Sequence, residues 1–258
     1  MRLLGERNFA ICCAIALGVY ACIYATNVML PEMMQTLMGY SPTKAGLTLS
    51  PAGLFTILEV PMVGYMVTKG IDPRLLAAAG LLAVAAATFW MSGLDLDVTP
   101  MNILWPRVVL SMGSGMMFVP LSTVAFRLLP SDQSGNAASL YALVRNEGSS
   151  IGVALVTTLI ARGSQMHQAI LVEHVSPFSP VAMQMLHRFS HITGGGEPIH
   201  AAQVALQLAY NLVGQQAAIL AYLDEFRHFG FLMLMIVPLI FLLKRAAADK
   251  GTGMIAVH

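Results

Sequence analysis

Four ionisable residues stand inside apolar stretches that are long enough to cross a bilayer: Glu59, Arg107, Arg145 and Glu147. A charge near the centre of a spanning helix costs at least about 2.5 to 3.5 kcal/mol on insertion scales. Such a residue therefore marks, by default, either a pathway for a polar species or an internal pair of charges. We interpret these four residues as candidates for one of these two roles.

Each of these four residues also has an explanation other than a pathway. Arg145 and Glu147 are two positions apart, roughly 200° around a helix, so they cannot pair well with each other, and each needs water or a partner on another helix. Arg107 follows Trp105 near the end of its stretch and could instead extend its charge to the membrane interface. Glu59 could be a carboxylic acid that its apolar surroundings keep protonated. A purely structural polar contact is an alternative for Glu59, Arg145 and Glu147.

Small residues recur at a spacing of four, which places them on one face of a helix and lets two backbones approach closely. Ser111 and Gly115 form one such pair, and Gly148 and Gly152 form another. Prolines add kinks, and they occur at Pro51, Pro61, Pro106 and Pro120. Kinked, tightly packed helices with buried charges suit a protein that rocks between two states, although rigid membrane scaffolds use the same packing.

The elements that must position these residues are membrane-spanning helices. Of the 258 residues, 57% are hydrophobic and only 10% are charged, whereas soluble chains carry about 25% charged residues. This composition excludes a soluble globule and a disordered chain. A span needs about 20 apolar residues, and the chain offers six: 9–30, 47–67, 75–94, 103–126, 137–160 and 226–243.

The sequence thus predicts an all-α polytopic membrane protein, in which residues 1–258 form a single six-helix transmembrane bundle. Residues 161–225 are too polar to span and predict a long periplasmic loop before the last helix, partly helical from Ala201 to Leu223. This loop carries five histidines at irregular spacing, which favours a solvated loop over metal binding or pH sensing. They are His167, His174, His187, His191 and His200.

Lysine and arginine in the short loops predict the orientation, since these residues concentrate on the cytoplasmic side. An arrangement with both termini in the cytoplasm places eight of these residues on that side: Arg2, Arg7, Lys69, Arg74, Arg127, Lys244, Arg245 and Lys250. The periplasmic side then holds few lysines and arginines. Most of them lie in the long loop, and the charge of long loops has little influence on orientation.

Several functional classes lack support in the sequence. A net charge of +1 gives no basic field for nucleic acid. Cys12, Cys13 and Cys22 fall in one apolar run and are interpreted as small buried hydrophobes, so no metal site is predicted. No nucleotide-binding loop and no HExxH motif occurs, so we expect no enzyme and no cofactor. Energy for any transport would have to come from an ion or proton gradient.

Several stretches match one known family, and their order follows the order of the predicted spans. They are Leu30–Glu32, Gly39–Leu47, Pro51–Gly53, Arg107–Gly115 (which includes Gly113), Ala137–Ser139 and Arg145–Gly152, the last being the most specific. On these residues the chain resembles the carboxyl-terminal half of a major facilitator superfamily transporter. The resemblance is to the 14-span drug:proton antiporter group of the EmrB/QacA type, and nearest to its EmrB-like branch.

The family's cytoplasmic gating loop between the second and third helices is also present in part. Gly64, Lys69 and Arg74 match its pattern, whereas Thr68 stands where an acidic residue is expected and Ile71 where a second glycine is expected. The charge pairing of that gate therefore departs from the family pattern in this half.

The resemblance implies the carboxyl-terminal portion of a proton-coupled multidrug exporter in the bacterial inner membrane, carrying amphipathic drug-like molecules. Arg107, Arg145 and Asn146 would line or brace the path, while Glu59 and Glu147 stand at positions usually uncharged in relatives. The amino-terminal half would be missing, so we expect a fragment, a split gene product or a shortened gene model. A periplasmic membrane-fusion adaptor and an outer-membrane channel are implied partners. The alternative is a transport-inactive scaffold or relic half that needs a partner chain.

Overall fold

The computed structural model describes residues 6–96, 98–127, 134–174 and 198–243, and these ranges consist of helices and the turns that join them, without a strand. The helices are α1 (Arg7–Thr36), α2 (Pro42–Leu49), α3 (Pro51–Thr68), α4 (Pro73–Met91), α5 (Pro100–Arg127), α6 (Ser134–His174) and α8 (Pro198–Phe241). The all-helical architecture predicted from the sequence is therefore confirmed for the described residues.

Local sequence signals set where several helices begin. The Ser41 side chain accepts a hydrogen bond from the Lys44 amide at the start of α2, and Pro42 occupies the first turn. The Asp72 side chain likewise accepts from the Arg74 amide at the start of α4. Such caps satisfy amide groups that have no partner within the helix. The loop from α3 to α4 is a tight turn, in which Gly70 adopts a φ of +89°.

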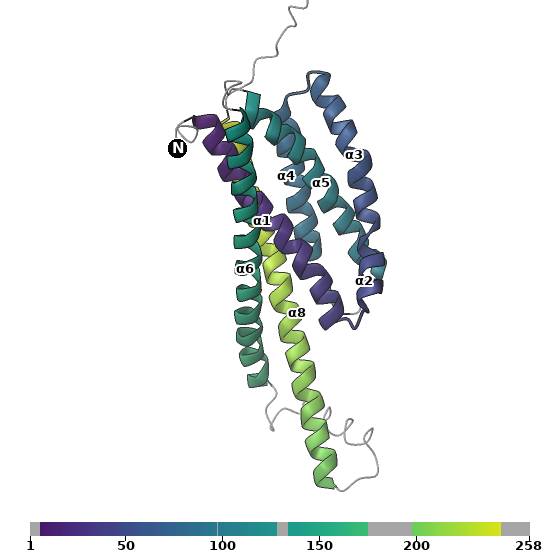
Figure 1. The fold of residues 1–258 in the computed structure, drawn as a ribbon. Helices are drawn as coiled ribbons and strands as arrows, with labels where there is room; N and C mark the ends of the chain where they lie inside the picture. The colour runs from purple at the N-terminus through teal and green to yellow at the C-terminus, as the bar shows by residue number, and fades with distance from the viewer. Residues whose placement is uncertain (1–5, 97, 128–133, 175–197, 244–258) are drawn as a thin grey trace, which may run out of the picture.

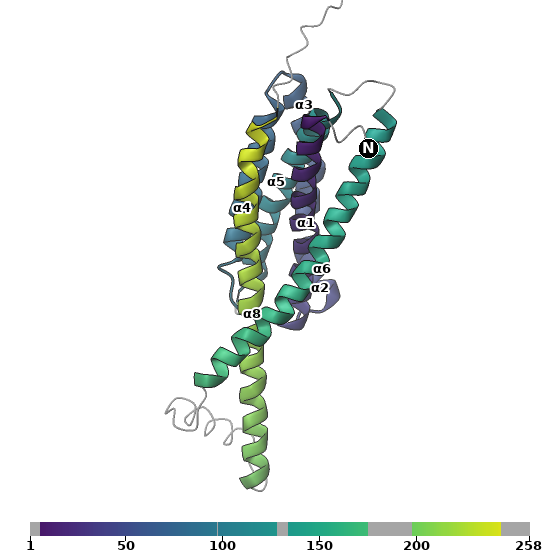
Figure 2. The same ribbon diagram turned by 90° about the vertical axis from the view of Figure 1, so that its left-hand side faces the viewer.

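The helices form an elongated bundle (Figures 1 and 2). α4 packs against α5 and α8, α1 packs against α6, and α3 lies at one side and packs mainly against α5. Buried apolar side chains from six helices form the core, and the largest fully buried ones include Phe9, Leu81, Leu121, Met33, Met91 and Phe226. The three cysteines are free and buried, as their apolar surroundings predict.

Four segments are long and apolar enough to cross a membrane: Arg7–Thr36, Pro42–Thr68, Pro73–Met91 and Pro100–Phe126. They coincide with the first four predicted spans. The fifth and sixth predicted spans, 137–160 and 226–243, lie mostly or wholly within α6 and α8, and their crossing of the membrane stays a prediction.

Two predicted boundaries differ from the structure. The span 47–67 is divided, because α2 ends at Leu49 and α3 begins at Pro51. Proline has no amide hydrogen and favours the first turn of a new helix. The third span is predicted at 75–94, but α4 ends at Met91. Just after it, the Gly93 amide donates a hydrogen bond to the Trp90 carbonyl, which closes a turn.

The described parts of 161–225 are helical. α6 continues from residue 160 to His174, and α8 begins at Pro198, well before the predicted span at 226. Both helices extend beyond the ends of α1 to α5 (Figure 1). Part of this segment packs in the bundle core, including Ile219 and Tyr222, and polarity alone does not distinguish a helix from a loop. His187 and His191 lie outside the described residues, as do the chain ends 1–5 and 244–258.

Candidate functional site

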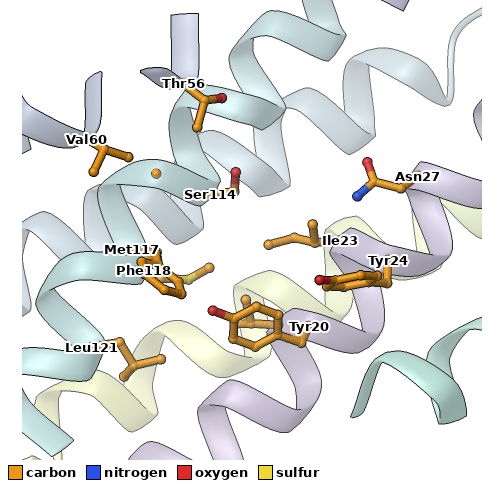
Figure 3. A pocket seen from close by; sticks show the side chains of 12 residues that line it. Tyr20, Ile23, Tyr24, Asn27, Thr56, Val60, Ser114, Met117, Phe118 and Leu121 are labelled. Carbon is orange, nitrogen blue, oxygen red and sulfur yellow. The ribbon is translucent and has the colours of Figure 1, made fainter. Parts of the chain in front are cut away.

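A cavity of about 280 Å³ opens between α1, α3 and α5. Its polar lining comes mainly from α1, which contributes Tyr20, Tyr24 and Asn27, with Thr56 from α3 and Ser114 from α5. Figure 3 shows the side chains of these residues around the hollow. The remaining lining is apolar and includes Val60, Met117, Phe118 and Leu121. A mostly apolar hollow with a few polar groups is the usual form of a small-molecule site.

Glu59 lies against the wall of this cavity. Its side chain is buried, and neither carboxylate oxygen has a hydrogen-bond partner. A Cβ atom added to Gly115, which lines the cavity, would lie 2.6 Å from Glu59 Oε2. The glycine on α5 therefore leaves the space that the carboxylate of α3 occupies. An ionised carboxylate in this position would be costly without a cation or donor.

Arg145 contacts the ring of Tyr20, which lines the same cavity. Its guanidinium carbon lies 5.5 Å from the ring centroid of Tyr20, and its Nε atom is buried without a hydrogen-bond partner. A guanidinium at this distance is attracted by the ring face. The partner that Arg145 requires on another helix is thus an aromatic ring of α1.

The other pathway candidates lie elsewhere. Asn146 and Glu147 follow Arg145 on α6, but both are exposed and neither lines the cavity. Arg107 of α5 is half-buried, with its Nη1 atom buried and unpartnered. Within the described part of the chain, none of these charged candidates joins an ion pair. Glu59 and Arg145 therefore each contact a residue that lines the cavity, Gly115 and Tyr20 respectively, but no charged candidate lines it.

Glycines bring two pairs of helices into close contact. Gly148 and Gly152 of α6 lie against the backbone of Leu17 and Ala21 on α1. A Cβ added to Gly113 of α5 would lie 2.8 Å from the Gly80 carbonyl oxygen of α4. Ser111 of α5 is also buried. Gly113, Gly148 and Gly152 therefore lie at helix crossings, whereas Gly115 faces a side chain.

The segment that resembles the gating loop is largely exposed. Lys69 lies over the ring of Tyr65 with its Nζ atom 5.3 Å from the centroid. Nothing lies within 4 Å of a Cβ added to Gly64, and the Arg74 Nη2 atom is buried without a hydrogen-bond partner. The left-handed backbone position of the turn falls at Gly70, one residue before Ile71. The turn thus keeps a glycine, displaced by one position from the family pattern.

A polar cluster joins α6 to the part of α8 that packs in the bundle core. His167 Nε2 lies 2.8 Å from Asp224 Oδ2, and Arg227 lies 3.4 Å from the same carboxylate. His228 Nδ1 lies 3.3 Å from Glu225 Oε1. Among the described residues, no group of three or more His, Cys, Asp and Glu side chains could hold a metal ion. The cluster is therefore a contact between helices, which the expectation of a solvated loop around His167 missed.

Other features of the site were also missed. Tyr20, Tyr24 and Asn27 recur at intervals of four and three residues in an otherwise apolar helix, which places them on one face. That periodicity could have predicted a polar face on this helix. The pairing of His167 with Asp224 joins residues 57 positions apart, and no local pattern indicates it.

The family model described as Major Facilitator Superfamily matches residues 2–153, more than half of the chain. The chain belongs to the major facilitator superfamily.

Individual relatives in this superfamily are exporters and resistance proteins by name. The chain is 30% identical over 255 residues to the fatty acid resistance protein FarB of Neisseria gonorrhoeae, covering 98% of the chain and 48% of FarB. It is 30% identical over 201 residues to the multidrug export protein EmrB of Escherichia coli K12, covering 76% and 38%. It is 27% identical over 259 residues to the probable multidrug resistance protein EmrY of the same strain, covering 98% and 48%.

These matches confirm the resemblance to EmrB-like members of the major facilitator superfamily. Together with the apolar helices, they identify a multi-pass membrane protein of a transporter family. The chain spans about half the length, or less, of the curated relatives it matches.

Proposed function

We propose that the chain is the carboxyl-terminal portion of a proton-coupled multidrug exporter, and that the cavity between α1, α3 and α5 belongs to its transport path. The resistance and export proteins that match the chain support the class of function. The cavity supports its location, because substrate sites of such transporters lie between helices near the membrane midplane.

The observation that carries the proposal is the unburied apolar surface of α3. In the most apolar window of α2 and α3, only 17% of the residues are buried, against 56% in each of the other three apolar segments. Large side chains on α3 are exposed, including Ile57, Leu58 and Met62. The surface beside the cavity is thus available to substrate, lipid and the amino-terminal half of the transporter.

In this mechanism the two halves rock about the substrate, and a proton entering from outside favours release of the drug to the outside. Arg145 braces the wall of the path through the ring of Tyr20, which itself lines the cavity. Arg107, Asn146 and Glu147 are assigned to the path only by their position in the sequence, and remain candidates.

The same proposal places the chain in the bacterial inner membrane with both termini in the cytoplasm. The extended ends of α6 and α8 then lie on the periplasmic side (Figure 1). A periplasmic adaptor of the membrane-fusion type and an outer-membrane channel are the partners we propose for the whole transporter. Its substrates are amphipathic drug-like molecules, and it needs no bound cofactor besides the proton gradient.

The test is an efflux assay in bacterial cells that lack their own pumps. The chain is expressed alone and together with the amino-terminal half of EmrB, and energised loss of a fluorescent drug is measured. We expect efflux only when both halves are present, and collapse of that efflux with a protonophore. Absence of efflux in both cases, with membrane insertion verified, would favour the transport-inactive scaffold instead.

A further inference from the structure

The turn between α3 and α4 lies at a membrane surface. It joins two segments that are long and apolar enough to cross a membrane, Pro42–Thr68 and Pro73–Met91. Residues 69–72 therefore stand at the depth of the lipid head groups, whichever way the chain is oriented. Figure 1 shows α3 at the edge of the bundle. Lipid can thus approach this turn from the side.

Two basic residues of this turn have no acidic partner within the described ranges of the chain. Lys69 is exposed, and its Nζ atom lies 5.3 Å from the ring centroid of Tyr65. Arg74 is half-buried, and its Nη2 atom is buried without a hydrogen-bond partner. Neither residue belongs to an ion pair among the described residues. Two such cations at one membrane surface attract an anionic group.

The acidic residue of the turn is engaged in capping α4. The Asp72 side chain accepts a hydrogen bond from the Arg74 amide over 3.1 Å. Because Asp72 stands against two basic side chains, Lys69 and Arg74, the turn keeps a net positive charge. The amides of residues 69–71 donate to carbonyl groups at the end of α3. An anion at this turn would consequently meet the basic side chains rather than those amides.

Exposed apolar side chains lie next to the two cations in the sequence. Ile71 has 37% of its surface exposed and Leu75 has 58%, and Tyr65 of α3 is exposed as well. A Cβ atom added to Gly64 or Gly70 would meet nothing within 4 Å, so the surface around the turn is open. Apolar surface beside positive charge at a membrane boundary matches a phospholipid, which carries acyl chains next to a phosphate.

Both departures from the gating-loop pattern favour an anionic ligand with apolar chains. Thr68 replaces the expected acidic residue, and its hydroxyl donates to the Tyr65 carbonyl over 2.8 Å. The position before Lys69 therefore adds no negative charge. Ile71 replaces the expected glycine and adds an apolar side chain. Phosphatidylcholine suits the turn less well than an anionic lipid, because Lys69 and Arg74 repel its choline cation.

We propose that the turn between α3 and α4 binds an anionic phospholipid, with Lys69 and Arg74 contacting the head-group phosphate and Ile71 and Leu75 contacting the acyl chains. An uncharged glycerol head, as in phosphatidylglycerol, leaves the phosphate charge uncompensated and suits this site. Such binding goes beyond the proposed function, since it requires neither a substrate nor the amino-terminal half of a transporter.

The test is photo-cross-linking of lipid to the purified full chain in phosphatidylcholine nanodiscs. The nanodiscs contain a small fraction of phosphatidylglycerol or phosphatidylcholine that bears the same diazirine on an acyl chain, and mass spectrometry identifies the labelled peptides. We expect phosphatidylglycerol to label residues 62–75 about tenfold more than phosphatidylcholine does. Equal labelling by the two lipids, or a preference confined to other parts of the chain, would overturn the proposal.

Lys69→Gln and Arg74→Gln each remove one charge from the turn. We expect each to lower labelling by phosphatidylglycerol about fivefold and to leave labelling by phosphatidylcholine unchanged. Lys44→Gln is the matched control, because the Lys44 Nζ atom also lies over a tyrosine ring, 4.2 Å from the centroid of Tyr40. It stands at the opposite end of Pro42–Thr68. An equal loss in Lys44→Gln would show an effect of net charge alone and would refute the site.

A measurement on the native chain covers the case in which a variant fails to fold. Sodium chloride screens exposed charges, so it should lower labelling of the turn by phosphatidylglycerol toward the phosphatidylcholine value. A preference that high salt leaves unchanged would contradict an ionic contact. Inorganic phosphate should act no more strongly than sodium chloride of equal ionic strength. Stronger displacement by phosphate would assign the turn to the free anion and overturn the assignment to lipid.

Discussion

Gly115 of α5 and Glu59 of α3 occupy one space between their helices: a Cβ atom on the glycine would lie 2.6 Å from the carboxylate oxygen. The absent side chain thus allows an acidic residue to be buried beside the cavity. Gly115 also lines the cavity, so the carboxylate contacts one of the residues that form its wall.

Gly152→Ala is expected to lower the free energy of unfolding by about 1 to 3 kcal/mol, because the new methyl group would overlap the backbone of Ala21 on α1. Backbone atoms cannot swing aside as a flexible side chain can. Thermal unfolding of the purified protein in detergent measures the change. Gly53→Ala is the control, since a Cβ there meets nothing within 4 Å. Equal midpoints for the two variants would contradict this account of the crossing.

Arg145→Ala in an assembled two-half transporter is expected to reduce drug export about tenfold or more, because it removes the cation that holds the Tyr20 ring at the cavity. Initial efflux rates at equal expression provide the measurement. Arg145→Lys keeps the charge and should retain part of the activity. Unchanged export by a folded Arg145→Ala protein would show that Arg145 does not brace the path.

His167→Ala is expected to weaken the contact between α6 and α8, since it removes the hydrogen bond to Asp224. The loss should be about 1 kcal/mol, the usual net value of a single hydrogen bond. Hydrogen exchange in residues 161–174 should become faster. His228→Ala affects an exposed histidine on α8 and should leave that exchange rate unchanged. Equal exchange in the native chain and His167→Ala would count against this contact.

Burial of Glu225 should make the packing of α8 in the bundle less stable as pH rises. Burial, and to a smaller extent the charge of Asp224, raise the pKa of Glu225 above its ordinary value of 4.5, while His228 opposes the shift. For a raised pKa, the stabilising contribution is complete below the unfolded value and is lost as pH rises through the folded value. Glu225→Gln should therefore raise the unfolding midpoint at neutral pH relative to the native chain, and the difference should vanish near pH 4. A constant difference across this range would exclude titration of Glu225 as its cause.

The sequence predicted those parts of the fold that depend on local composition. The first four apolar spans follow from hydrophobic runs, and Gly148 and Gly152 at helical spacing predicted a close backbone approach on one face of α6. That α1 is the partner helix was not predicted. Within 161–225 the sequence predicted helix only from Ala201 to Leu223, whereas α6 continues to His174 and α8 begins at Pro198. Polar helices and polar loops have the same composition, so composition did not separate them.

The candidate site shows the same division. Glu59 and Arg145 were identified from the sequence, since a charge in an apolar run is conspicuous. Their arrangement was not, because the contacts of Glu59 with Gly115 and of Arg145 with Tyr20 join distant parts of the chain. Asn146 and Glu147, identified by the same reasoning, are exposed on the surface of α6.

The length of α8 has a mechanical consequence. At 44 residues it is one continuous helix of about 66 Å, roughly twice the thickness of the hydrocarbon layer of a membrane. Part of it packs against α4 in the bundle, and its amino-terminal part extends beyond the bundle (Figure 2). A rigid rod of this kind acts as a lever. A small tilt of the bundle about the membrane plane would become a displacement of many ångströms at the far end of α8.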